Sequence, residues 1–198
     1  MIGAPPGGPV PSPIAPLLAR YSAEAPARGS AGAAVLILLR AGRTDVETLL
    51  IERTVQPKDP ASGQVGLPGG RVQSQDESLV NTALREVEEE VGLSPTDLAR
   101  PPQFVAIRSA RVFSLDVAVF AGELGPAGRS PIVASRGEVA HVFWLPRSAL
   151  SHQRRVMVDS RAGAREVDAA VFDGHVIWGF THRVLLDFFE GPAPGSPT

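Results

Sequence analysis

Short apolar stretches and polar turn residues alternate over residues 31–190, and their spacing predicts both strands and helices. Two strands are predicted at 31–39 and 46–52, joined by the turn Ala41-Gly42-Arg43. Further strands are predicted at 103–110, 112–123, 138–145, 154–159 and 166–172, with loops at 58–62 and 125–130. A short helix is expected at 146–151. A closing helix at 178–190 would turn Phe180, Val184, Leu185 and Phe188 inward.

One further helix is predicted at 75–91, because four apolar residues there follow the spacing of a single buried stripe. Ser74 is the expected N-cap, and Glu77 three residues later completes a capping box. Gly92 supplies the stop. The apolar stripe consists of Val80, Leu84, Val87 and Val91.

The same helix carries four glutamates within five positions, directly after Arg85. Like charges at helical spacing destabilise a helix by a few tenths of a kcal/mol per pair, and a bound cation would reverse that effect. At about 100° per residue, Glu86, Glu89 and Glu90 share a face away from the apolar stripe, while Glu88 points elsewhere. Oxygen ligands alone favour Mg²⁺, or Mn²⁺ as a substitute, over zinc. The alternative is an acidic face that is merely solvated.

Composition narrows the class of protein. The chain of 198 residues suits one domain, its 43% hydrophobic content is ample for a core, and its net charge of −2 predicts neither a nucleic-acid nor a membrane partner. No signal peptide and no membrane span are recognised, and cysteine is absent, so a cytoplasmic protein is expected. The proline-rich residues 1–30 are expected to form a flexible arm with one short turn near 15–21. Residues 31–190 would form the domain, and residues 191–198 a loose tail.

A glycine pair precedes the acidic helix, in the segment Leu67-Pro68-Gly69-Gly70-Arg71. Glycines let the backbone approach a ligand closely and expose its amides and carbonyls. A Gly-Gly loop that leads into a helix with three glutamates on one face is much rarer than either feature alone.

These residues together resemble the Nudix hydrolases. That family's box is Gly, five residues, Glu, seven residues, then Arg-Glu-apolar-x-Glu-Glu-x-Gly-apolar. Glu77 stands eight residues before Arg85, as the box requires, but Gly70 lies one residue too far upstream of Glu77. The matching end of the box consists of Arg85, Glu86, Val87, Glu89, Glu90, Gly92 and Leu93. The resemblance covers about residues 31–190, and it implies an α/β fold, an α/β/α sandwich around a mixed central sheet.

In having one extra residue in this loop, the chain resembles the coenzyme A pyrophosphatase-like branch of that family. Its upstream signature is Leu-Leu, an Arg-Ser or Arg-Thr pair, then Gly-x-x-x-Phe-Pro-Gly-Gly. The chain has Leu49-Leu50, Arg53-Thr54 and the run from Gly63 to Gly70, with Leu67 in place of the usual Phe. The stretch from Arg53 to Gly63 is one residue longer than in that signature, and only Lys58 represents the basic residue expected there.

The resemblance implies hydrolysis of a nucleoside diphosphate derivative with Mg²⁺ or Mn²⁺, and it assigns roles to the box. Glu86, Glu89, Glu90 and the backbone carbonyl of Gly69 would hold metal, and Glu89 or Glu90 would also hold or deprotonate the attacking water. Arg85 would orient the carboxylates. Glu77 would support the loop, and Gly92 is a further supporting residue.

Candidates outside the end of the box are weaker. Glu138 is a candidate base that could touch metal or substrate, ahead of Glu123 and Asp116; the alternative is an ordinary loop-edge carboxylate. A 3′-phosphate needs arginine or lysine. The cations that could border the cleft are Arg53, Lys58, Arg71, Arg108 and Arg111, with Gly70 giving close backbone approach. His182 is expected at the edge of the core, and Trp178 in core packing ahead of adenine stacking.

Three functions remain open. The leading one is conversion of coenzyme A or acyl-coenzyme A to 3′,5′-ADP and (acyl-)4′-phosphopantetheine. A rival keeps the chemistry with ADP-ribose, a dinucleotide or a nucleoside triphosphate. A third is a Nudix-fold binding module without catalysis, although all the box glutamates are present. Enzymes of this family are often dimers, so a homodimer is a candidate assembly.

Overall fold

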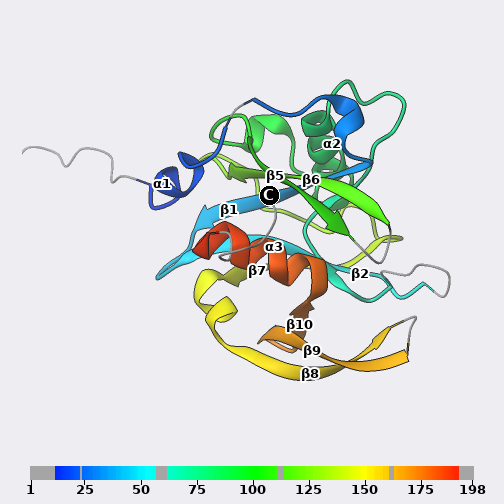
Figure 1. Cartoon of the computed structure of the whole chain (residues 1–198). Helices are drawn as coiled ribbons and strands as arrows, with labels where there is room; N and C mark the ends of the chain where they lie inside the picture. The colour runs from blue at the N-terminus through cyan, green and yellow to red at the C-terminus, as the bar shows by residue number, and fades with distance from the viewer. Residues whose placement is uncertain (1–11, 23, 57–61, 111–113, 161–162, 192–198) are drawn as a thin grey trace, which may run out of the picture.

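The computed structural model of this protein describes residues 12–22, 24–56, 62–110, 114–160 and 163–191 (Figure 1). The strands are β1 (Ala33–Ala41), β2 (Val46–Arg53), β3 (Val65–Gly66), β4 (Gly69–Arg71), β5 (Gln103–Ala110), β6 (Leu115–Glu123), β7 (Val139–Pro146), β8 (Gln153–Ser160), β9 (Gly163–Phe172) and β10 (His175–Trp178). The α-helices are α1 (Ala15–Leu18), α2 (Leu79–Val91) and α3 (Gly179–Glu190), and 3₁₀ turns lie at Arg28–Ser30, Pro95–Asp97 and Arg147–Ser151.

The central sheet is mixed, as the sequence predicts. Its strands run in the order β3-β2-β1-β6-β5, with β4 also pairing with β1 and β7 with β2. The pairing of β1 with β6 is parallel, while the other pairings in this sheet are antiparallel. A second, antiparallel sheet has the order β10-β9-β8 and lies beside the main sheet (Figure 1).

Alternate residues of β1 face two separate cores, and this alternation builds the sandwich. Leu36 and Leu38 pack with the buried residues Leu79, Ala83, Val87 and Val91 of α2, so the predicted stripe is confirmed at Val87 and Val91 but not at Leu84. Ile37 and Leu39 pack with α1 and α3 on the opposite face. All four β1 side chains are fully buried. Because successive side chains of a strand point to opposite faces, one strand supplies both cores. The expected α/β/α sandwich is confirmed.

Helix α2 begins later than predicted. Its N-cap is Ser78, whose hydroxyl accepts the backbone N–H of Asn81 at 3.2 Å, so the predicted start at residue 75 with Ser74 as the cap is wrong. The chain before Ser78 is instead a turn, in which Asp76 accepts the backbone N–H of Gln73 at 2.8 Å. The predicted end is confirmed, since Gly92 has the left-handed φ of 70° and donates to Glu88.

The expectation of a flexible arm does not describe residues 12–22. Ile14 and Leu18 are buried in the core on the α3 side. Tyr21 stacks on Phe188 of α3 with ring centroids 5.4 Å apart, and Ser22 forms a bridge to β5. The short turn expected near 15–21 corresponds to α1, and this segment packs against the end of α3 instead of extending freely. Residues 1–11 and 192–198 lie outside the described ranges.

Most predicted strands are confirmed within a few residues, but three short ones were missed. These are β3, β4 and β10, each of four residues or fewer, and β10 extends the predicted β8–β9 hairpin into a three-stranded sheet. The strand predicted from Glu138 begins at Val139 instead. The short helix predicted at 146–151 is a 3₁₀ turn. None of the helices in the described ranges has the length and apolar character needed to cross a membrane.

Candidate active site

The polar face of α2 holds two buried glutamates and one exposed one. Glu90 is 1% exposed and Glu86 is 8% exposed, which is unusual for carboxylates. Glu89 lies at the rim of the same face, and Glu88 is exposed to solvent. The predicted helical face is therefore real, and the sheet and glycine segment cover its deeper part.

The glycine pair lies against these carboxylates as the short strand β4. Gly69 pairs with Val35 of β1 and has a φ of 151°, and its N–H donates to Oε2 of Glu90 at 2.9 Å. A Cβ on Gly70 would stand 2.5 Å from the carboxyl carbon of Glu86. At Gly69 a Cβ would instead collide with the carbonyl oxygen of Ala34, so close approach to β1 requires glycine there and close approach to Glu86 requires it at Gly70.

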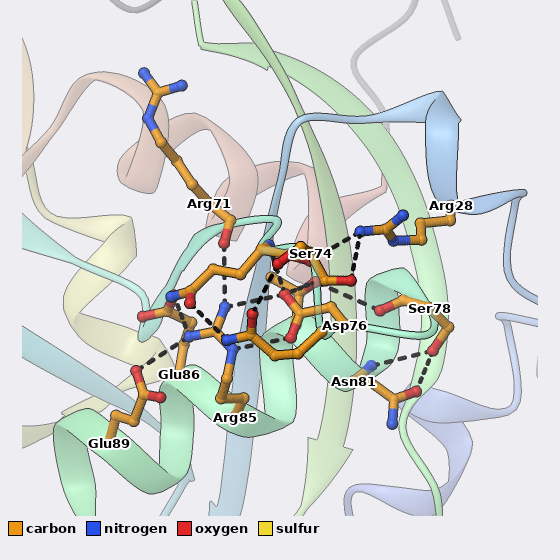
Figure 2. Close-up of polar contacts among 12 residues, drawn as sticks. Arg28, Arg71, Ser74, Asp76, Ser78, Asn81, Arg85, Glu86 and Glu89 are labelled. Carbon is orange, nitrogen blue, oxygen red and sulfur yellow. Dashed lines mark hydrogen bonds and ion pairs between the residues drawn. The ribbon is translucent and has the colours of Figure 1, made fainter.

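Arg85 ties the glutamates to the loop before the helix (Figure 2). Its Nη1 donates to Glu86 at 2.8 Å and to Glu89 at 3.0 Å, and its Nη2 donates to the carbonyl of Arg71 at 3.1 Å. Its Nε and Nη2 also bind the two carboxylate oxygens of Asp76 at 2.9 and 3.1 Å. The rigid fork of a guanidinium suits such a bridge, which a lysine could not make.

Asp76 is the residue that sequence reasoning missed. It is buried, and it accepts from Thr82 Oγ1 at 2.9 Å in addition to Arg85 and Gln73. The hydrogen bond from Arg85 holds the pKa of Asp76 well below its usual range. Five residues separate Gly70 from Asp76, which is the spacing that the Nudix box gives between its glycine and its first acid. Counting forward from the glycine would therefore have found it.

Glu77, chosen by counting back from Arg85, does not support the loop. It is exposed, and the cap of α2 comes from Ser78. The extra residue of the loop thus lies between Asp76 and Arg85, and Asp76 performs the function expected of Glu77.

Negative charge accumulates around Glu90. Its pKa is raised to about 8, chiefly by burial and also by the charges of Glu86 and Glu138, against the Gly69 hydrogen bond and the charge of Arg53. Burial likewise raises the pKa of Glu86, with Arg85 opposing the shift and Glu89 and Glu138 adding to it. For both carboxylates burial outweighs the positive charge nearby, which is Arg53 for Glu90 and Arg85 for Glu86.

Arg53 and Glu138 meet this cluster from the neighbouring strands. Arg53 ends β2, pairs with Val139 across a bulge, and places Nη1 3.8 Å from Oε1 of Glu90. The carbonyl of Glu138 accepts the N–H of Thr54 at 2.9 Å, which fixes the turn before β7 beside the end of β2. The structure thus brings both residues to the glutamates, although Glu138 itself is exposed.

Other predicted candidates lie elsewhere or outside the described ranges. The side chain of Arg71 extends away from the Arg85 cluster (Figure 2), and Lys58 and Arg111 are not among the described residues. Arg108 pairs with Asp187 of α3 at 3.2 Å. Four further candidates also lie in other surroundings. Glu123 binds Ser12 and Arg100, and Asp116 binds Ser109. His182 is buried in α3, and Trp178 lies under the guanidinium of Arg165.

The donor chemistry of the cluster fits a hard divalent cation. Its available donor atoms are carboxylate oxygens, and for the two buried carboxylates Arg53 and Arg85 only partly offset the rise in pKa caused by burial. Within the described part of the chain, no three acidic or histidine side chains stand ready to hold one ion. Each of the three glutamates uses one oxygen to accept a hydrogen bond from Arg85 or from the Gly69 N–H. A carboxylate can accept several contacts, so these bonds leave acceptor capacity for a cation.

Comparison with known proteins agrees with this geometry. The family profile of the NUDIX domain matches residues 30–165. The chain is 31% identical over 141 residues to the uncharacterized Nudix hydrolase NudL of Photorhabdus laumondii, covering 70% of this chain and 73% of that protein. It is 32% identical over 147 residues to NudL of Salmonella paratyphi B, covering 70% and 71%.

Solved structures show the same fold at low identity. A NUDIX hydrolase from Alicyclobacillus acidocaldarius superposes with a TM-score of 0.53 and 17% identity, covering 80% of this chain and 90% of that one. A MutT/nudix family protein from Enterococcus faecalis gives a TM-score of 0.54 and 16% identity, covering 84% and 64%. The chain belongs to the Nudix hydrolases and is a pyrophosphohydrolase of that family.

Proposed function

We propose that this protein hydrolyses the diphosphate linkage of coenzyme A or acyl-coenzyme A with Mg²⁺ or Mn²⁺, giving 3′,5′-ADP and (acyl-)4′-phosphopantetheine. The observation that carries the chemistry is the contact of Glu86 and Glu90 with the Gly69-Gly70 backbone, fixed by Arg85. Buried carboxylates against a glycine backbone are suited to a cation and to the close approach of a phosphate.

The residues divide the work by position. Glu86, Glu89, Glu90 and the carbonyl of Gly69 would hold the cation, which when bound neutralises the phosphates and lowers the pKa of a bound water. Glu89, at the exposed rim, or Glu138, in the turn before β7, would accept the proton as water attacks phosphorus and the bond to the bridging oxygen breaks. Arg85, fixed by Asp76, keeps Glu86 and Glu89 in place.

The coenzyme A assignment depends on the signature before the box, and two placements support it. Arg53 of the signature lies beside Glu90, where it could contact a phosphate oxygen. Leu67, which replaces the usual Phe, is buried in the core on the α3 side, so the replacement concerns packing and not a substrate contact. Gly70 gives close backbone approach, and Arg71 and Lys58 are further candidates for the 3′-phosphate.

The deciding experiment is hydrolysis of a matched panel with Mg²⁺ and then Mn²⁺, with products identified by mass. The panel is coenzyme A, dephospho-coenzyme A, ADP-ribose, NADH and diadenosine tetraphosphate. We expect coenzyme A to be strongly preferred over dephospho-coenzyme A, because the 3′-phosphate is the group that Arg53 or its neighbours would bind. Preference for ADP-ribose or a dinucleotide would contradict the coenzyme A assignment while leaving the diphosphatase chemistry intact.

Glu90→Gln is the control for that chemistry. It keeps the shape of the side chain and removes the charge of the most buried carboxylate in the cluster, so we expect turnover to fall by more than about a hundredfold. Circular dichroism and the melting temperature should show an intact fold. If the natural protein turned over none of the panel with either metal, the binding-module interpretation would replace this proposal.

A further inference from the structure

A second cleft opens near the end of β2, on the face of the main sheet that α3 covers. Its volume is about 270 Å³, and it lies between β2, the segment that leads into β3, and the strands β8 and β10 of the second sheet (Figure 1). Val65, which lines it, belongs to the core on the α3 side. A volume near the lower end of the range for small-molecule sites suits a single ring better than a long flexible chain.

One wall of this cleft carries a fixed carboxylate. Nδ1 of His175 lies 3.1 Å from Oε2 of Glu52, and the His175 ring stacks on Phe143 with centroids 4.0 Å apart. A carboxylate accepts several hydrogen bonds, so this contact leaves acceptor capacity on Glu52. The exposed carboxylate of Asp159 lines the same cleft. The cleft therefore disfavours a phosphate and suits a neutral group that donates N–H hydrogen bonds.

Another wall carries an aromatic side chain. Trp178 ends β10, and the guanidinium of Arg165 lies 5.2 Å from the centroid of its ring. Val158 and Val176 line the cleft as well. Aromatic rings stack on the flat faces of bases whatever their identity. Trp178 thus offers a surface for a planar ring, and the carboxylate of Glu52 supplies the means to identify it.

The cleft and the candidate active site lie on opposite sides of the same strand end. Glu52 lines the cleft, whereas Arg53, the next residue of β2, places Nη1 3.8 Å from Oε1 of Glu90. The N–H of Arg53 donates to the carbonyl of Gln64, another lining residue, at 3.0 Å. The glycine run 63–70 begins in the cleft and ends against Glu90. A nucleotide whose phosphates lie at the glutamates can therefore pass the end of β2 and place its base in the cleft.

We propose that this cleft binds the adenine ring of the substrate, and that Glu52 identifies adenine by accepting a hydrogen bond from its 6-amino group. The flat face of the ring packs against Trp178. Guanine and hypoxanthine carry an oxygen acceptor at that position, which would face the carboxylate and leave both groups unpaired. The inference rests on the proposed function only in that the substrate must contain adenosine diphosphate, as coenzyme A and ADP-ribose both do.

The first test is the binding of AMP and IMP, which differ in this part of the base and contain no diphosphate linkage to hydrolyse. The chain has two tryptophans, so Trp144→Phe leaves Trp178 as the single fluorescent reporter. We expect AMP to change the fluorescence of Trp178 and to bind at least about fivefold more tightly than IMP. Equal dissociation constants, or no change in fluorescence with either nucleotide, would overturn the proposal.

The second test changes the acceptor. Glu52→Gln keeps the size of the side chain, and its amide can donate to the oxygen of hypoxanthine, so the preference for AMP should fall to about twofold or less. Glu47→Gln is the matched control, because Glu47 lies on the same strand but pairs with Arg40 at 2.7 Å and does not line the cleft. It should keep the full preference. A preference that survives in Glu52→Gln, or that is lost equally in both variants, would contradict the assignment of Glu52.

Failure of this adenine site can be told apart from failure of the proposed function. Hydrolysis of coenzyme A by a protein that binds AMP and IMP equally would overturn the adenine site and leave the proposed function intact. A preference for AMP that is lost in Glu52→Gln, without turnover of coenzyme A, would support the adenine site and contradict the coenzyme A assignment.

Discussion

Two aspartate–arginine pairs in this protein are alike in geometry and differ in what the arginine reaches. Arg85 binds Asp76 through Nε and Nη2, and Arg129 binds Asp97 through the same two nitrogens, at distances of 2.8 to 3.2 Å. In both pairs the arginine holds the pKa of the aspartate well below its usual range. An ion pair by itself therefore does not mark a site.

The difference lies in the surroundings of each pair. The side chain of Arg85 is 15% exposed, and its Nη1 continues to Glu86 and Glu89. The side chain of Arg129 is 61% exposed, and Asp97 also accepts the backbone N–H groups of Ser94 and Arg129. The first pair holds the carboxylates of α2 in position, whereas the second pair stabilises a surface loop.

Replacing each aspartate by asparagine separates the two pairs by the largest expected effect. Asp76→Asn should lower kcat/KM for the best substrate by about tenfold to a hundredfold, because groups that orient metal-ligating side chains typically contribute that much. Asp97→Asn, the same substitution at the other pair, should leave kcat/KM unchanged. The Mg²⁺ concentration at half-maximal activity should rise for Asp76→Asn alone. Equal kcat/KM of the two variants would show that activity does not depend on Asp76 holding Arg85 in position.

A smaller effect is expected from a substitution that displaces a carboxylate of α2 and leaves both aspartate–arginine pairs unchanged. In Gly70→Ala the new Cβ would collide with the carboxyl group of Glu86, so that side chain must move. We expect a loss of about tenfold in kcat, since small displacements at a reacting centre are costly. Gly29→Ala is the control, because a Cβ there meets no atom within 4 Å. Full activity of Gly70→Ala would mean that the position of Glu86 is not critical.

The smallest effect is on stability in acid, and it should be shared by both pairs. The folded pKa of each aspartate lies below its unfolded value of about 3.9, so each pair stabilises the fold fully above that pH and loses its contribution as the pH falls toward the lower folded pKa. Each asparagine variant should melt a few degrees lower at pH 7. The gap from the natural protein should narrow progressively as the pH falls from about 5 to about 2. A gap constant with pH in thermal melts would contradict this account.

The sequence predicted the glutamate face of α2 because helical period alone decides which residues share a face. It did not predict where the helix starts, because Ser74 and Ser78 both suit a cap, and the contacts of Asp76 with Gln73, Thr82 and Arg85 decide between them. Local pattern cannot contain such contacts.

The missed strand β10 and the unpredicted docking of the turn near 15–21 both depend on distant partners. The segment His175–Trp178 is too short to show an alternation, and it becomes a strand because Phe172 and its neighbours in β9 pair with it. The helix at Ala15–Leu18 has only four residues, and it is held by burial of Ile14 and Leu18 against elements far along the chain. Sequence therefore predicted the features that depend on local period and missed those that depend on distant partners.

The docking of the N-terminal segment on α3 has a consequence for biosynthesis. Arg20 and Tyr21 both donate to the backbone carbonyl of Phe188, which lies 168 and 167 positions later in the chain, respectively. At a translation rate of about 5 to 20 residues per second, the N-terminal helix emerges on the order of ten seconds before its partner exists. Until α3 is synthesised, the apolar side chains of Ile14 and Leu18 lack that part of their core. Completion of the fold on that face of the sheet therefore waits for the synthesis of α3, whereas α2 and its carboxylates can assemble on β1 and β4 much earlier.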